Sequence, residues 1–128
     1  MAREATETLG RERYVNLITL KRDGSEVRTP IWVAPVDDKL YAISDGTTVK
    51  VKRLRRNARI RLAPCDARGK ISGGWHEGSG RVVDDAALIA KANGALARKY
   101  GLQFAVLNLA SRLFGRIRRR ATLEFSID

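Results

Sequence analysis

The stretch YVNLITLKRDGSEVRTPIWVA, from Tyr14 to Ala34, indicates the class of the fold. Its first part, Tyr14 to Lys21, is rich in β-branched and apolar residues and favours a β-strand. Asp23-Gly24-Ser25 favours a hairpin turn, because glycine readily adopts the positive φ that such turns require. Glu26 to Ala34 then predicts a second strand, which pairs antiparallel with the first.

Alternation of side chains divides the second strand into two faces. We expect one face to carry Val27, Thr29, Ile31 and Val33, and the other Arg28, Pro30 and Trp32. Because proline has no N–H to donate to a β-ladder, Pro30 predicts a strand at a sheet edge, or one that faces a bulge or a ligand.

The rest of the chain extends this pattern. Further strands are predicted at Leu40–Ser44, Ala58–Cys65, Trp75–Val83 and Ala121–Ile127, and helices at Val49–Arg56, Asp84–Tyr100 and Gln103–Gly115. Strands joined mainly by hairpins argue for a small antiparallel β-barrel rather than a doubly wound sheet. No linker or internal repeat divides the chain, so residues 1–128 are expected to form one domain.

Composition narrows the classes of function. Lysine and arginine number 25 against 14 acidic residues, a net charge of +11 that attracts nucleic acid, anionic lipid or a phosphorylated cofactor without choosing among them. One cysteine, Cys65, and one histidine, His76, exclude an internal disulfide and leave no ordinary zinc site. The polar N-terminus and the short apolar runs predict a cytoplasmic protein with no membrane partner.

The strongest indication of a ligand is KVKRLRRNARIR, from Lys50 to Arg61, with seven basic residues in twelve and no acidic residue. The loop Ser44-Asp45-Gly46-Thr47-Thr48 precedes it. A hydroxyl-rich loop that opens into a basic helix can hold a phosphate, because helix N–H groups and lysine or arginine side chains all favour an anion. Lys50, nearest the helix start, is the best single candidate. The alternative is a solvated helix face.

Two tryptophans are candidates for the wall of a planar ligand. Trp32 shares a strand face with Pro30, and Trp75 follows a glycine-rich loop. Either could instead be a core or interface residue. His76 and Cys65 favour no catalytic role, and no catalytic motif occurs, so we predict no catalytic side chain. This pattern fits a protein in which a bound cofactor supplies the chemistry.

Several motifs together resemble the pyridoxamine 5'-phosphate oxidase-like split barrels. They are RTPIWVA at Arg28–Ala34, LYAIS at Leu40–Ser44, TTVKVKRLRRNARIRLAPC at Thr47–Cys65 and GSGRVVDD at Gly78–Asp85. The likeness is greatest to the B-type deazaflavin-dependent oxidoreductases, which use coenzyme F420. The resemblance implies a mainly β fold, a six- or seven-stranded antiparallel split β-barrel of the FMN-binding type. It also implies a homodimer with cofactors bound in grooves between protomers.

The same resemblance implies the site residues. Thr48, Lys50 and Lys52 would hold the cofactor phosphate, with Arg53, Arg55 or Arg56 near its acidic tail. Thr29, Pro30, Ile31 and Trp32 would line the ring. Ser44, Asn57 and the partner subunit's Trp75 complete the implied set.

The expected function is therefore an F420H2-dependent oxidoreductase that transfers a hydride between the deazaflavin and a small unsaturated or quinone-like substrate. The coenzyme carries more negative charge than FMN, which suits a cluster of seven cations. An FMN-binding oxidoreductase of the same fold is one alternative. Another is a nucleic-acid-binding barrel. Because the aromatic residues do not alternate with the cations on one strand face, we expect no nucleic-acid partner.

Overall fold

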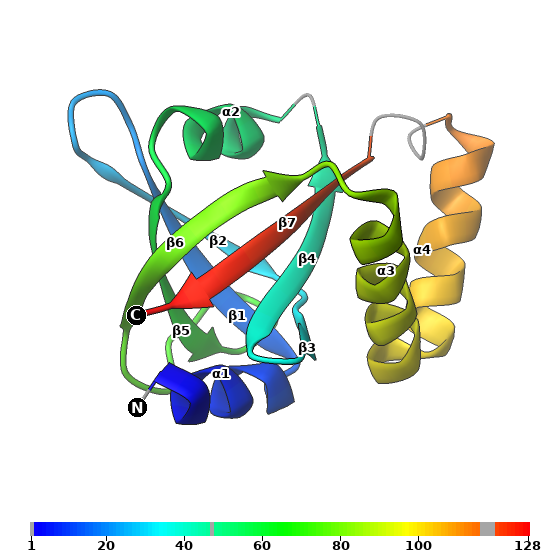
Figure 1. The fold of residues 1–128 in the computed structure, drawn as a ribbon, viewed down its shortest axis with the longest axis horizontal. Helices are drawn as coiled ribbons and strands as arrows, with labels where there is room; N and C mark the ends of the chain where they lie inside the picture. Colours follow the sequence, from blue (N-terminus) through cyan, green and yellow to red (C-terminus); the bar gives the residue numbers. More distant parts are fainter. Residues whose placement is uncertain (1, 47, 116–119) are drawn as a thin grey trace.

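Seven strands and four helices make up the part of the chain that the computed structural model describes, residues 2–46, 48–115 and 120–128 (Figure 1). The strands are β1 (Tyr14–Leu20), β2 (Glu26–Ile31), β3 (Ala34–Val36), β4 (Lys39–Asp45), β5 (Arg59–Cys65), β6 (His76–Val83) and β7 (Arg120–Ile127). The helices are α1 (Ala2–Arg11), α2 (Val49–Arg56), α3 (Ala86–Tyr100) and α4 (Leu102–Leu113).

All seven strands belong to one antiparallel sheet in the order β2-β1-β5-β6-β7-β4-β3. The two edge strands, β2 and β3, follow each other in the chain, so only Trp32 and Val33 connect one edge of the sheet to the other. The sheet therefore curls into a barrel that stays open between its edge strands, β2 and β3. This confirms the mainly β, antiparallel barrel expected from the sequence.

The expected single strand from Glu26 to Ala34 is wrong, because it breaks at Trp32 and Val33. The backbone of Val33 is bonded by α3 instead of by a neighbouring strand. Its N–H donates to the Tyr100 hydroxyl at 3.0 Å, and its carbonyl accepts from that hydroxyl and from the Lys99 ammonium. The two-face pattern of the strand is confirmed, since Ile31 and Val33 are buried while Arg28 and Pro30 are exposed.

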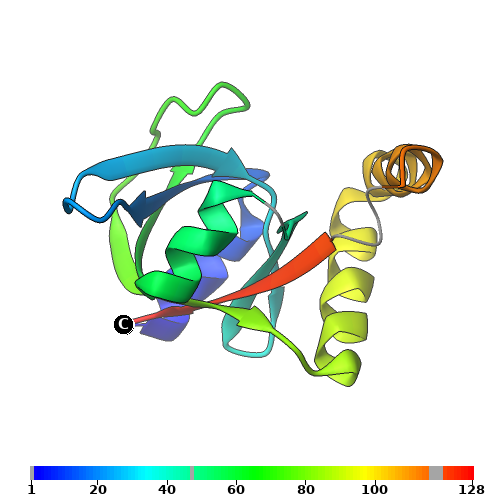
Figure 2. The same cartoon turned by 90° about the horizontal axis from the view of Figure 1, so that it is seen from above.

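Helices close the two ends of the barrel (Figures 1 and 2). At one end α1 contributes the fully buried Leu9, and at the other α2 contributes Val51 and Leu54. Between them the core is built from side chains of β1, β4, β5 and β7, with Phe125 the largest. The polar first residues thus form a packed helix.

The helices α3 and α4 form a hairpin beside the barrel. Asp85 caps α3 by accepting a hydrogen bond from the N–H of Ala87, and Gly101 ends it with a φ of 55°. The expected start at Asp84 and the expected Gln103–Gly115 range of the second helix differ from the observed ends by one or two residues. No helix in the described ranges has both the length and the apolar character needed to cross a membrane.

Candidate functional site

The basic helix α2 is held against the barrel by its apolar side and by a glycine of β6. Val51 and Leu54 enter the core, and Gly80 lies directly beneath Leu54. A Cβ at Gly80 would come within 3.0 Å of Phe125 Cδ1 and 3.1 Å of Leu54 Cδ2, so a larger residue there would require these side chains to shift. The buried side fixes which way the cations of α2 can point.

The start of α2 presents unpartnered donors. Thr48 is the N-cap residue, but its side chain makes no capping hydrogen bond to the helix; its Oγ1 instead donates to the carbonyl of Asp45 at 2.8 Å. The Ser44 hydroxyl lies 3.4 Å from the same oxygen. Among the described residues, no side chain accepts from the N–H groups of the first turn. Thr47, also in this loop, lies outside the described residues.

Lys50 follows this open helix end and is only partly exposed. Burial lowers the pKa of its ammonium group. No carboxylate among the described residues forms an ion pair with it. A half-buried cation without an acid next to free N–H groups is suited to bind an anion.

The other cations of α2 do not converge on one point. Lys52, Arg55 and Arg56 are exposed, and Arg53 is half-buried. Arg56 donates to the carbonyl of Leu20 at 3.1 Å, which directs it toward the β1–β2 hairpin. Asn57 ends the helix, and its side-chain oxygen accepts from the N–H of Arg59. Asn57 thus has a structural role besides any part in binding.

Trp32 packs inside the molecule on one face of its ring. Its ring stacks on Tyr100 of α3, with centroids 4.6 Å apart and planes 10° from parallel. Of its expected companions on the ring wall, Pro30 is exposed, Thr29 is half-buried, and the side chain of Ile31 belongs to the barrel core. Ile31 could therefore meet a ligand only through its backbone.

The fold brings the end of β2 toward the end of β4. Trp32 and Ile43 pack against the same apolar cluster of α3 and α4, and Ser44 follows Ile43 directly. The shared cluster connects Trp32 with the strand that leads to Ser44, but not with Lys50. Trp75 lies elsewhere: the guanidinium of Arg28 stacks on its ring at 5.2 Å, and it lines a separate surface hollow near α1.

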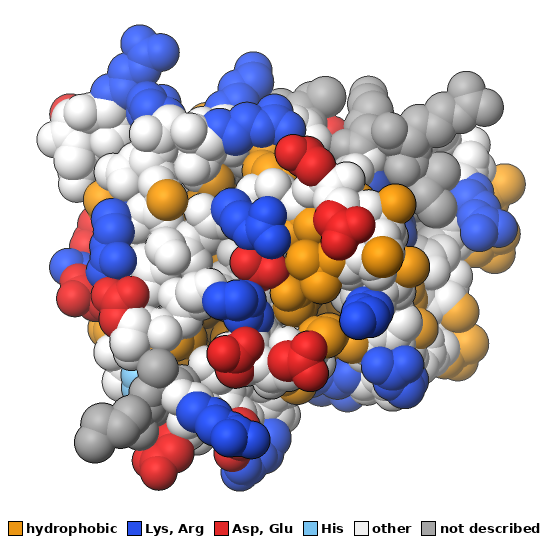
Figure 3. All heavy atoms as spheres, in the orientation of Figure 1, with side chains coloured by type: hydrophobic (Ala, Val, Ile, Leu, Met, Phe, Trp, Pro, Cys, Tyr) orange, Lys and Arg blue, Asp and Glu red, His pale blue; other side chains and the backbone are white. Residues whose placement is uncertain are grey.

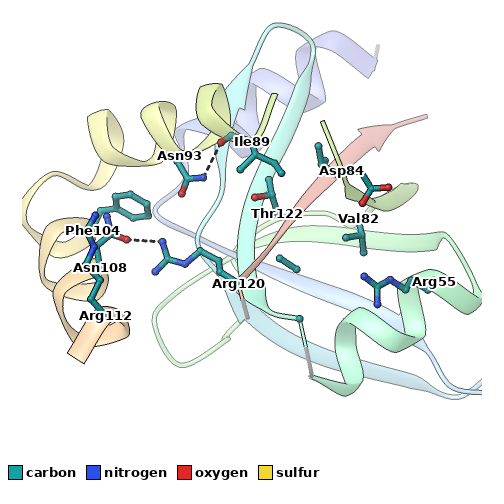
Figure 4. Close-up of a pocket in the computed structure, with 13 residues that line it drawn as sticks. Arg55, Val82, Asp84, Ile89, Asn93, Phe104, Asn108, Arg112, Arg120 and Thr122 are labelled. Carbon is teal, nitrogen blue, oxygen red and sulfur yellow. Dashed lines mark hydrogen bonds between the residues drawn. The ribbon is translucent and has the colours of Figure 1, made fainter. Parts of the chain in front are cut away.

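Another cavity, of about 600 Å³, lies between the barrel and the α3–α4 hairpin (Figure 4). Arg55 is the only expected site residue that lines it. The other side chains that characterise it are Arg112, Arg120, Asn93, Asn108 and Phe104. A neighbouring hollow of about 170 Å³ contains Ser44 and shares Arg120. The sequence analysis missed these residues, and the only signal for them was the arginine-rich run before the last strand.

Two further titratable groups bear on the chemistry. Burial raises the pKa of the Cys65 thiol, which disfavours a nucleophilic thiolate. Glu124 is buried on β7, where its carboxylate accepts from the Tyr41 hydroxyl at 2.6 Å and from Arg81 Nε at 2.8 Å. The polar groups of these three side chains bond to one another, and this network links β4, β6 and β7.

No protein-family model and no curated protein matches the sequence. Solved structures do resemble the fold. A candidate pyridoxamine 5'-phosphate oxidase from Listeria innocua matches with a TM-score of 0.65 at 12% identity, over 99% of this chain and 93% of that protein. An FAD-binding protein from Mesorhizobium loti matches with a TM-score of 0.64 at 19% identity, over 98% and 88% of the two chains.

The similar structures do not share one ligand. The heme storage protein HutZ from Vibrio cholerae matches with a TM-score of 0.71 at 10% identity, over 98% of this chain and 88% of that protein. Identities this low establish architecture rather than activity. The chain therefore has the split β-barrel fold found in pyridoxamine 5'-phosphate oxidase-like proteins.

Proposed function

We propose that this protein is an F420H2-dependent oxidoreductase acting on a small unsaturated or quinone-like molecule. The observation that carries the proposal is Lys50, a half-buried cation at the N-terminus of α2 that has no carboxylate partner among the described residues. We place Lys50 and Trp32 at the same opening of the barrel, as the resemblance to the split barrels implies. The split-barrel fold, which the FAD-binding protein from Mesorhizobium loti shares, supports a flavin-like ring as the ligand.

The residues at the opening fit a phosphorylated coenzyme. The first-turn N–H groups of α2 and the ammonium group of Lys50 are donors for phosphate oxygens. Lys52 and Arg53, further along the helix, extend the positive charge away from this point. A long anion makes better use of such a row than a single phosphate does, which favours F420 over FMN.

The chain's own residues would bind and orient the ring rather than donate protons to it. Pro30 and Thr29 present a flat strand edge, and Trp32 is fixed by its stacking on Tyr100. When bound, the reduced deazaflavin supplies the hydride. FMN remains the alternative cofactor, because its phosphate would meet the same donors.

We also propose that the protein is a homodimer. The outer face of α4 exposes Leu102, Val106, Leu109 and Leu113, which lie three or four residues apart on one side of the helix. Apolar side chains gather along this helix at the right edge of Figure 3. A second copy of the chain carries the same stripe, so two copies can cover each other across a twofold axis.

Substitution of Lys50 tests whether this residue binds the phosphate of the coenzyme. We expect Lys50→Ala to weaken binding of F420 by roughly 1.5–3 kcal/mol, the contribution of a charge-assisted hydrogen bond. Arg11→Ala is the matched control, since Arg11 carries the same charge on α1 at the other end of the barrel. Isothermal titration of both variants measures the difference.

Equal affinity of the two variants for F420 would show that Lys50 does not bind the phosphate of the coenzyme. If neither F420 nor FMN binds the native protein, and nucleic acid binds in a salt-sensitive manner, the oxidoreductase proposal fails in favour of a nucleic-acid-binding barrel.

A further inference from the structure

The cavity between the barrel and the α3–α4 hairpin has the dimensions and chemistry of a ligand site separate from the start of α2. Its volume of about 600 Å³ falls within the range of small-molecule pockets. It draws its walls from α2, β6, α3, α4 and β7. Lys50 and Trp32 do not line it.

Arg120 is the central group of this cavity. One of its terminal nitrogens donates to Asn108 Oδ1 at 2.7 Å and the other to Ser111 Oγ at 3.0 Å. The guanidinium also lies 5.9 Å from the centre of the Phe104 ring. Two neutral partners on α4 therefore fix its direction while leaving its charge unpaired and some of its N–H groups free.

The positive charge here is not compensated by the protein. Among the described residues no carboxylate forms an ion pair with Arg55, Arg112 or Arg120. Burial, and then the nearby charge of Arg112, lower the pKa of Arg120. Figure 4 shows Arg120 between Arg112 on one side of the cavity and Arg55 on the other. An anion in this cavity would relieve the repulsion.

The remaining lining indicates what kind of anion fits. Ile89 and Phe104 provide an apolar wall, and Asn93, Asn108 and Thr122 add neutral polar groups. Asp84 also lines the cavity, which leaves an excess of two positive charges from three arginines and one aspartate. A planar carboxylate can accept two N–H groups of one guanidinium, and an aromatic ring attached to it would meet the apolar wall.

We propose that this cavity binds a small aromatic carboxylate, with the carboxylate on Arg120 and Arg112 and the ring against Phe104 and Ile89. Arg55, an expected cofactor residue, is part of this lining, but Lys50 and Trp32 are not. The inference therefore does not require that the bound cofactor be F420.

Titration with benzoate tests the proposal, with benzamide as the neutral molecule of the same shape. We expect saturable binding of benzoate, with benzamide at least about tenfold weaker. In ¹H–¹⁵N spectra, benzoate should shift the amide signals of Asn93, Phe104 and Asn108 but not those of Lys50 or Trp75.

Arg112→Gln is the main variant, because the side chain of Arg112 is exposed and makes none of the hydrogen bonds that hold α4. We expect it to weaken benzoate binding at least about tenfold, whereas Arg11→Gln leaves it unchanged. Arg120→Gln should abolish binding, and circular dichroism checks that this variant keeps its helices.

Three results would overturn the proposal: benzoate binding that does not saturate, equal weakening in Arg112→Gln and Arg11→Gln, or displacement of benzoate by the cofactor. The last would place both ligands in one site. Lys50→Ala distinguishes the two proposals, since it should reduce cofactor binding and leave benzoate binding intact.

Discussion

At the scale of single residues, the structure assigns a clear environment to the charged groups that the sequence can only count. Lys50 and Arg120 are cations without a carboxylate partner among the described residues, whereas Arg59, Arg61 and Arg81 are paired with acids. Unpaired, partly buried charge is the property that distinguishes a binding group from a solvated one. The sequence identified Lys50 because a hydroxyl-rich loop precedes it. It missed Arg120, whose partners Asn108 and Ser111 are polar residues in an otherwise apolar helix.

Glu124 leads to a prediction on the pH dependence of stability. Burial alone would raise the pKa of this carboxyl, but the hydrogen bonds from Arg81 and Tyr41 outweigh it and lower the pKa below the ordinary 4.5. Because the pKa is lower in the folded state, the network contributes its full stabilisation at pH values above the ordinary pKa of 4.5. This stabilisation is lost as the pH falls through the pKa of the folded state.

Glu124→Gln should therefore lower the free energy of unfolding at neutral pH by roughly 1–3 kcal/mol, because one hydrogen-bond partner is left unsatisfied. The difference from the native protein should shrink in acid. Urea unfolding at about pH 7 and about pH 3 measures it. A difference that stays constant over this range would refute the role assigned to the carboxylate.

At the scale of elements, the sequence predicted those segments whose signals are local. The helix Val49–Arg56 was predicted with its observed bounds, and the end of the next helix at Tyr100 was predicted as observed. The break at Trp32 and Val33 was not predictable from local sequence. It depends on Lys99 and Tyr100, which lie more than sixty positions further along the chain and bond the backbone of Val33.

The helix α4 gives the prediction at this scale. If its apolar stripe joins two copies of the chain, Leu109→Glu should place a charge in the interface and dissociate the dimer. The exposed position of Leu109 means that the fold of the single chain should survive. Light scattering with circular dichroism follows both properties, and Arg98→Glu on α3 is the control for an added acid. Two outcomes would argue against this interface. One is a Leu109→Glu variant that keeps the mass of a native dimer, and the other is a native protein with the monomer mass of about 14 kDa.

At the scale of the whole molecule, the order of the strands explains why the barrel is open. The chain crosses from β2 to β3 in two residues, and these two strands are the unpaired edges of the sheet. The hairpin-rich order of strands predicted the barrel, and the resemblance to the split barrels predicted its opening. Neither predicted the cavity under α3 and α4, because its walls come from five elements distributed along the chain.

The central claim is that the opening beside Lys50 binds a deazaflavin coenzyme. The most direct measurement is a titration of the native protein with F420 and FMN side by side. The protein is then mixed with reduced F420 and a panel of enones and quinones while the absorbance of the coenzyme is recorded. The account predicts saturable binding of F420 that is tighter than that of FMN, and oxidation of reduced F420 by at least one acceptor. Tight binding of FMN without any binding of F420 would contradict it.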